Sequence, residues 1–185
     1  EEPRLLRHLH LPLQSGCDKI LRAMHRPYDT KRFTELVQEI RAQVPDVAIT
    51  TDVIVGFPGE TEEDFMTTLN FAKQCGFAKM HIFPYSKRKG TPAAEMPEQV
   101  DEAVKSERAA RLAQVDEQLH QQTLAAMVGK VAEVLLEQPV DAEHMEGLCG
   151  PYLRVIVPAT SDMANTIAKV KIIGVKEDFL LGELN

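Results

Sequence analysis

Short runs of alternating or continuous apolar residues, separated by helical periods, fill the first half of the chain. Residues 7–13 alternate polar and apolar side chains, which predicts a strand that ends near Pro12. The nearly continuous apolar run from Val47 to Phe57 predicts a parallel strand buried on both faces, and residues 80–83 predict a third strand. Helical periods between them predict helices over 17–25, 31–43 and 61–76. This β-α-β-α-β order calls for parallel strands with right-handed crossovers.

The second half of the chain changes character twice. Residues 98–126 are rich in Ala, Glu, Gln and Arg and predict one long amphipathic helix. Three short apolar runs follow, separated by Gly, Pro and acidic turns: 131–136, 153–157 and 167–172. This spacing predicts a small antiparallel β-barrel after an α/β domain.

Composition and charge exclude several classes of protein. The chain has 185 residues, of which 44% are hydrophobic and 26% charged, which fits a globular protein and not a disordered one. A net charge of −7 excludes a strongly basic nucleic-acid binder, although a local basic patch remains open. No apolar run approaches a membrane span, and residues 1–4 match neither a signal nor a transit peptide. A cytoplasmic protein is expected.

The cysteines give no metal-binding motif. Cys17, Cys75 and Cys149 lie far apart, and no C-x-x-C or C-x-x-x-C spacing occurs. We expect three reduced, buried side chains without a disulfide.

Three unusual turns follow the three predicted strands, over residues 13–16, 56–60 and 84–91. Since parallel strands end at one edge, where ligands bind in α/β barrels, a ligand site is expected at this rim. Gly56 and Gly59 would let the backbone approach a flat ligand, and the next helix would point free N–H groups there. A tight strand-to-helix turn explains the same glycines equally well.

The last of these turns carries the basic run Lys87-Arg88-Lys89 beside Tyr85. Positive charge for a phosphate backbone and a ring for stacking are typical of a nucleic-acid contact. A solvated basic loop is the simpler interpretation of the charge alone.

Histidines and one aspartate remain ambiguous. His8 and His10 point to the same face of the first strand, so they could bind a metal, but no third ligand is evident and polar packing is favoured. Asp52 is either a buried hydrogen-bonding carboxylate or a site residue. The sequence holds no nucleophile elbow, Walker loop or zinc-protease motif.

Three segments at the predicted rim together resemble one family. They are HLHLPLQSG at 8–16, TDVIVGFPGET at 51–61 and FPYSKRKGTPAA at 83–94, and they closely resemble the radical S-adenosylmethionine methylthiotransferases. By this resemblance, residues 1–97 form the C-terminal half of a partial (β/α) barrel, the radical SAM domain. Residues 98–126 form a linking helix, and 127–185 form a TRAM domain, an OB-like β-barrel.

The resemblance implies a transferase that modifies tRNA. The stretch 80–88 looks most like the branch acting on threonylcarbamoyladenosine next to the anticodon. Sister branches act on isopentenyladenosine in tRNA or on a ribosomal protein. In the family, one [4Fe-4S] cluster cleaves S-adenosylmethionine to a radical that abstracts hydrogen, and a second cluster takes part in sulfur delivery. A cofactor must carry this step, because side chains cannot supply such a radical.

The sequence departs from the family pattern in three ways. It contains no C-x-x-x-C-x-x-C loop and begins near the fourth barrel strand, so we expect a C-terminal fragment that needs the N-terminal half and is inactive alone. Cys17 stands where the family usually has serine. Residues 127–185 carry five basic and nine acidic side chains, which weakens the expectation that this domain binds RNA.

The resemblance also implies site residues, although it assigns no catalytic side chain and no metal ligand. The residues expected at S-adenosylmethionine are Gln14 and Ser15 as polar contacts, Ile54, Val55 and Gly56 at the adenine, and Phe83 and Pro84 as the wall. The residues expected at the tRNA anticodon arm are Tyr85, Lys87, Arg88, Lys89, Lys130, Arg154, Lys169 and Lys171. A non-catalytic RNA-binding module is the alternative, beside the sister enzymes.

Overall fold

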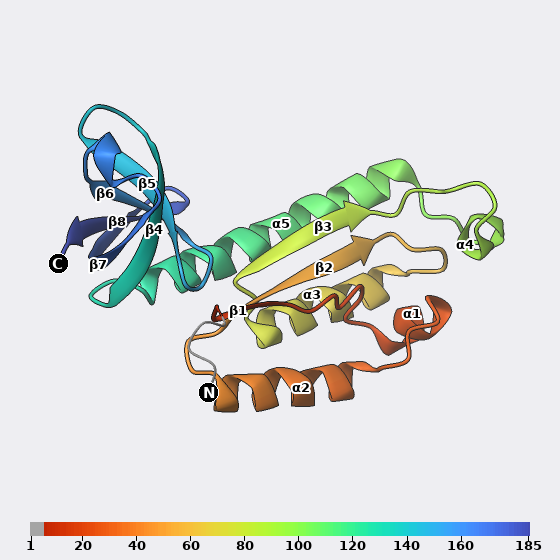
Figure 1. The fold of residues 1–185 in the computed structure, drawn as a ribbon. Coiled ribbons are helices and arrows are strands. Elements are labelled where there is room, and N and C mark those ends of the chain that lie inside the picture. Colours follow the sequence, from red (N-terminus) through yellow and green to blue (C-terminus); the bar gives the residue numbers. More distant parts are fainter. Residues whose placement is uncertain (1–5) are drawn as a thin grey trace. The chain divides into compact units, whose positions relative to one another are not determined.

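The computed structural model describes residues 6–185 and divides them into two compact units (Figure 1). One unit comprises Leu9–Pro45 and Ile49–Leu119, and the other comprises 6–8, Asp46–Ala48 and His120–Asn185. Residues 1–4, on which the expectation of no leader peptide rested, lie outside the described residues.

The elements are β1 (His8–His10), α1 (Asp18–Ala23), α2 (Thr30–Gln43), β2 (Ala48–Val55), α3 (Glu62–Cys75), β3 (Lys79–Pro84), α4 (Pro92–Glu95), α5 (Glu102–Ala125), β4 (Val131–Pro139), β5 (His144–Cys149), β6 (Arg154–Pro158), η1 (Ser161–Met163), β7 (Thr166–Lys176) and β8 (Phe179–Leu184).

The first unit is built on a sheet with the strand order β1-β2-β3 (Figure 1). Strands β2 and β3 are parallel, in a register that runs from Thr50 opposite Lys79 to Val55 opposite Pro84. Beyond β1, Gln14 forms a parallel bridge with Val53. The predicted parallel arrangement is therefore confirmed.

Local sequence signals explain where the two long crossover helices begin and end. The Asp29 carboxylate accepts the Arg32 amide at the start of α2. Thr61 and Asp64 form a capping box at the start of α3, which lies within the helix predicted over 61–76. Gly76 ends α3 in the left-handed conformation, at φ 59°.

Strand β1 is shorter than the predicted run of 7–13, because the chain leaves regular pairing before Pro12, which has no N–H to donate. The Tyr28 hydroxyl takes over part of the hydrogen bonding, since it lies 2.9 Å from the carbonyl oxygen of Pro12 and 3.1 Å from that of Leu13. The segment after β1 is therefore fixed by a side chain and by single backbone bonds to β2.

The second unit contains a closed barrel with the strand order β4-β5-β6-β8-β7. Three of its strands were predicted, and β5 and β8 were missed. Gly147 and Gly182 interrupt the apolar alternation of these two strands. The barrel also departs from the all-antiparallel expectation, because β6 and β8 pair in parallel. The core is formed by fully buried side chains that include Val134, Leu136, Met145, Val155, Val157, Val170, Ile172 and Leu180.

No helix among the described residues is both long enough and apolar enough to cross a membrane. The longest of them, α5, is instead amphipathic. It buries Leu112, Val115 and Leu119 along one stripe, as the predicted helix over 98–126 required.

Replacing Gly147 with alanine should destabilise the barrel by about 3 kcal/mol, because the new methyl group would collide with the backbone carbonyl of Leu135. Gly150→Ala is the matched control: no atom lies within 4 Å of its added methyl group, so a change within about 0.5 kcal/mol is expected. Urea unfolding followed by circular dichroism measures both. Equal stabilities would show that the close approach at Gly147 is relieved without cost.

Candidate functional site

The three predicted rim turns meet at the carboxyl end of β2. The Gln14 amide donates to the Asp52 carbonyl at 2.8 Å, and the Ile54 amide donates back to the Gln14 carbonyl at 2.8 Å. On the other side, the Tyr85 amide donates to the Val55 carbonyl at 2.8 Å. Backbone bonds therefore hold the first and third turns against the end of the central strand.

A pocket of about 430 Å³ opens where these turns meet. This volume lies in the range of small-molecule sites. Its lining residues are Gln14, Asp52, Ile54, Phe83, Pro84, Tyr85, Ser86, Arg88, Thr91 and Ala93. Phe83 is 52% exposed although it is a large apolar side chain, so the wall it forms is open to a ligand.

Three of the predicted cofactor residues, Ser15, Val55 and Gly56, do not line the pocket. Ser15 is fully buried, and its hydroxyl oxygen accepts the Cys17 amide at 3.2 Å and lies 3.2 Å from the Thr68 hydroxyl of α3. Val55 is also fully buried, and Gly56 is buried beside it. These residues hold the turns in place, whereas Gln14, Ile54, Phe83 and Pro84 face the pocket.

The glycine turn after β2 has a structural cause that the sequence did not reveal. Gly56 and Gly59 both have positive φ, 73° and 80°, which favours glycine at each position. A Cβ at Gly56 would collide with the side-chain stem of Lys105 from α5. The close approach at Gly56 is therefore made by a helix of the same chain.

A buried ion pair fixes the same turn. The Glu60 carboxylate accepts the Gly56 amide at 2.8 Å and the Arg108 guanidinium at 2.8 Å, and both side chains are at most 5% exposed. Burial raises the pKa of Glu60, while the Gly56 amide and Arg108 oppose that rise. The pair ties helix α5 to the rim.

The contact between α5 and the glycine turn could have been predicted from the spacing of basic residues in the helix. Lys105 and Arg108 precede Leu112, Val115 and Leu119 at helical spacing, so two cations occupy an otherwise apolar stripe. A buried position for a cation requires a partner, and Glu60 of the glycine turn is that partner for Arg108.

Tyr85 packs against its own unit. Its ring lies 5.4 Å from the Phe57 ring in an edge-on arrangement, and the Lys105 ammonium lies 5.4 Å from the Tyr85 ring centroid. Its hydroxyl is buried without a hydrogen-bond partner among the described residues. The ring face predicted to stack on a base is thus partly occupied, while the unpaired hydroxyl belongs to a residue that lines the pocket.

The basic run beside the pocket is exposed. Lys87, Arg88 and Lys89 are all on the surface, and Arg88 also lines the pocket. The Thr91 hydroxyl donates to the Arg88 carbonyl at 2.7 Å and closes the turn. The loop therefore presents three cations next to the pocket entrance.

The basic residues predicted on the barrel have acidic neighbours. The Arg154 guanidinium lies 2.6 Å from the Glu146 carboxylate and stacks over Phe179 at 5.3 Å. Lys169 is exposed opposite Glu133, and Lys171 is exposed opposite Glu183. These neighbours reduce the positive potential that the three residues could offer to RNA.

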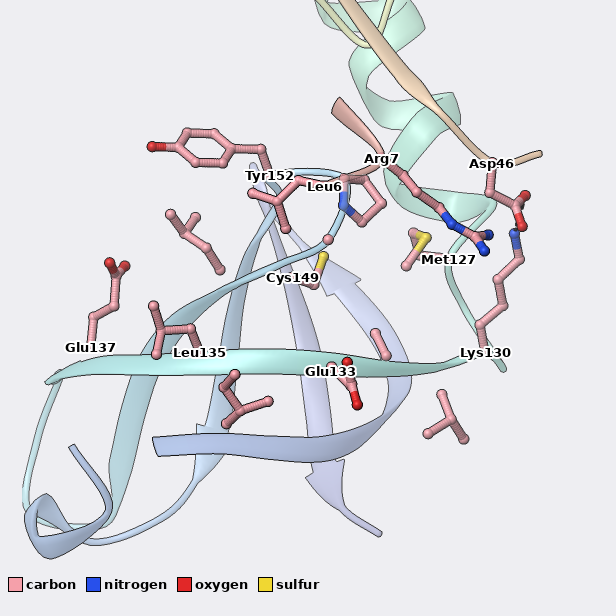
Figure 2. Close-up of a pocket in the computed structure, with 16 residues that line it drawn as sticks. Leu6, Arg7, Asp46, Met127, Lys130, Glu133, Leu135, Glu137, Cys149 and Tyr152 are labelled. Atoms are coloured by element: carbon pink, nitrogen blue, oxygen red, sulfur yellow. Dashed lines mark hydrogen bonds and ion pairs between the residues drawn. The ribbon is translucent and has the colours of Figure 1, made fainter. Parts of the chain in front are cut away.

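Figure 2 shows a second pocket, of about 680 Å³, in the unit that contains the barrel. Lys130 points toward Asp46 there, with 2.9 Å between the ammonium and the carboxylate (Figure 2). The other side chains that line it include Leu6, Leu135 and Tyr152. Of the residues predicted to contact tRNA, Lys130 lines this pocket.

The histidines are arranged differently from the predicted pair. The His8 ring lies 5.2 Å from the Tyr152 ring. His10 instead lies with Asp52 and His81, and one ligand atom from each falls within 4.8 Å of the others. The parallel register, in which Asp52 is opposite His81, is the signal that could have identified the third residue.

The chain matches known proteins over nearly its whole length. The family model described as "Radical SAM superfamily" matches residues 2–72. Threonylcarbamoyladenosine tRNA methylthiotransferase MtaB of Bacillus subtilis is 42% identical over 92% of this chain and 39% of its own length. The tRNA-2-methylthio-N(6)-dimethylallyladenosine synthases of a Thermoanaerobacter species and Thermobifida fusca are 41% and 51% identical over 98% and 75% of this chain.

These relatives are longer than this chain, which spans 39% of the first of them and 28% of the Thermobifida protein. Among solved structures, coproporphyrinogen III oxidase of Escherichia coli, a radical SAM enzyme, matches 64% of this chain at 19% identity and a TM-score of 0.45. The sequence matches and the predicted rim motifs both support the radical S-adenosylmethionine methylthiotransferase family for this chain.

Proposed function

We propose that this chain is part of a tRNA methylthiotransferase and contributes the open rim at which S-adenosylmethionine and tRNA meet. The observation that carries the proposal is the pocket lined by Gln14 and Arg88 of the first and third rim turns and by Ile54 and Phe83 at the ends of β2 and β3. The chain spans 39% of the length of the Bacillus subtilis relative. The activity of the whole enzyme is therefore proposed together with the role of this chain.

The residues of the pocket fit S-adenosylmethionine. Ile54 and Phe83 offer apolar contact to an adenine ring, and Gln14 offers an amide to polar groups of the same ligand. The Tyr85 hydroxyl needs a partner that the described residues do not provide. When bound and reduced, S-adenosylmethionine supplies the radical that removes hydrogen from the substrate carbon. Ser15, Val55 and Gly56 would act indirectly, by keeping the turns in position.

The cysteines of this chain do not fit an iron–sulfur cluster. Cys17, Cys75 and Cys149 are all buried, and no cysteine belongs to a group of three metal-ligating side chains at ligand spacing among the described residues. Cluster ligands are thiolates. We therefore propose that the clusters of the enzyme are held by residues outside these 185, and that this chain alone is inactive.

The exposed loop of Lys87, Arg88 and Lys89 is the proposed contact to the anticodon arm. The five-stranded barrel would act as an OB-like TRAM domain that grips RNA through Lys130, Arg154, Lys169 and Lys171. A tRNA substrate places the enzyme in the cytoplasm.

Among tRNA substrates we propose threonylcarbamoyladenosine, on the sequence of residues 80–88 and the match to the Bacillus enzyme. Dimethylallyladenosine is the second candidate, favoured by the synthase that is 51% identical over 75% of the chain. A role as an RNA-binding module without catalysis would require neither pocket ligand nor clusters.

Mass spectrometry of tRNA nucleosides from cells that lack the full-length gene tests the function. Loss of the methylthio group from threonylcarbamoyladenosine alone is the expected result. Loss from the dimethylallyl nucleoside would move the enzyme to the sister branch. An unchanged profile would contradict a role in tRNA methylthiolation.

Phe83→Ala should weaken binding of S-adenosylmethionine to this chain about tenfold, because the pocket loses an apolar wall worth about 1.4 kcal/mol. Equilibrium dialysis with labelled S-adenosylmethionine measures the affinity. Ile173→Ala, which truncates an apolar side chain 47% exposed on the barrel strand β7, serves as the control and should leave the affinity unchanged. Equal affinities for all three proteins would exclude Phe83 from the site.

Replacing Lys87, Arg88 and Lys89 together with alanine should weaken tRNA binding and flatten its salt dependence. With about 0.7 counterions released per contact to single-stranded RNA, the slope of log K against log salt should fall by about 2. The charge-matched control replaces the exposed Lys31, Lys73 and Lys176. If both triple variants show the same slope, the loop makes no specific contribution to the interface.

A further inference from the structure

We propose that His10, Asp52 and His81 form a Zn²⁺ site on the open face of the β1-β2-β3 sheet. The three side chains come from three neighbouring strands, and one ligand atom from each lies within 4.8 Å of the other two. Among the residues that the structure describes, these three side chains are the ones that lie close enough together to share one metal ion. The inference goes beyond the proposed function and does not depend on it.

The backbone register brings the three ligands together. Asp52 of β2 is the direct parallel partner of His81 of β3, so both side chains leave the sheet on the same face. His10 approaches from β1, and its ring centroid lies 5.8 Å from that of His81. Sheet pairing thus positions the ligands without help from a loop.

The ligand atoms of His10 and Asp52 are already as far apart as two ligands of one metal ion. The Nε2 atom of His10 lies 3.3 Å from Oδ2 of Asp52. In a tetrahedral Zn²⁺ site, with metal–ligand distances of about 2.0–2.1 Å, two ligand atoms are about 3.3–3.4 Å apart. His10 and Asp52 therefore span one edge of such a site, and His81, with a ligand atom within 4.8 Å of both, supplies the third ligand.

A second hydrogen bond prepares His10 as a ligand. Its Nδ1 lies 3.0 Å from the hydroxyl oxygen of Thr50. When Nδ1 carries the ring proton and donates it to Thr50, the lone pair of Nε2 is available to a metal ion on the side of the Asp52 carboxylate. Nε2 of His10, the Asp52 carboxylate and a ring nitrogen of His81 then offer three donors to one metal ion.

The site is accessible and has a suitable charge. Side-chain exposure is 37% for His10 and 28% for Asp52, and His81 is exposed, so an ion can enter from solvent. Two neutral imidazoles and one carboxylate are typical ligands of a catalytic Zn²⁺ centre, where three protein ligands leave the fourth position open. Asp52 also lines the rim pocket, so that open position would lie next to any ligand bound there.

Titration of the purified chain with Zn²⁺, followed by calorimetry, tests the proposal, and visible absorption of the Co²⁺ form reports the coordination. We expect one saturable site, lost in His81→Ala. Thr50→Val keeps all three ligands but removes the hydroxyl that orients His10, and it should weaken Zn²⁺ binding about 10–100-fold.

His144→Ala is the matched control, because its Nδ1 lies 3.0 Å from the Asp141 carboxylate in a pair outside the proposed group. Cys17→Ser controls for binding by a thiol. Both variants should bind Zn²⁺ like the parent chain. The proposal is overturned if the parent chain shows no saturable binding, if His81→Ala binds equally well, or if binding is lost with Cys17 or His144. Circular dichroism checks that each variant is folded.

Discussion

Parallel pairing to the carboxyl half of β2 is the constraint on which the rest of the first unit depends. Gln14 and Tyr85 form backbone hydrogen bonds to it, so the first and third turns are fixed relative to the strand from which the second turn continues. A slip of one residue in β2 would turn Val53 outward and Asp52 toward the helices. Because Val53 is fully buried, the hydrophobic core itself selects the register that presents Asp52 and Ile54 to the pocket.

The buried ion pair of Glu60 and Arg108 fixes the turn that follows β2. Such pairs contribute little net stability, because the desolvation of both charges offsets their attraction. Removing one partner would nevertheless leave an unpaired buried charge, which costs about 3–5 kcal/mol. The pair therefore acts mainly as an orientation constraint: Arg108 can be buried only if the turn from Gly56 to Glu60 keeps its present conformation.

Local signals in the sequence predicted those parts of the fold that local interactions determine. Thr61, Asp64 and Gly76 delimit α3 by capping, and the apolar run of β2 identifies a buried strand. The hydrophobic pattern did not predict the structure where a contact between residues far apart in the sequence determines it. Gly147 and Gly182 sit in strands because neighbouring strands approach them closely, and no local period encodes that approach. Likewise, Gly56 faces Lys105, a residue 49 positions away, and not a ligand.

The two faces of the β1-β2-β3 sheet differ in a way that points to function. A parallel sheet normally has both faces covered by apolar packing. Here Val53, Val55 and Met80 are buried on one face, whereas His10, Asp52 and His81 stand on the other, partly exposed. Polar side chains at this position forgo apolar burial, and His10 is held by Thr50 and Asp52 within the sheet. Their convergence beside an open pocket is therefore best explained by a ligand that they bind, and the strand register positions them for it before the ligand arrives.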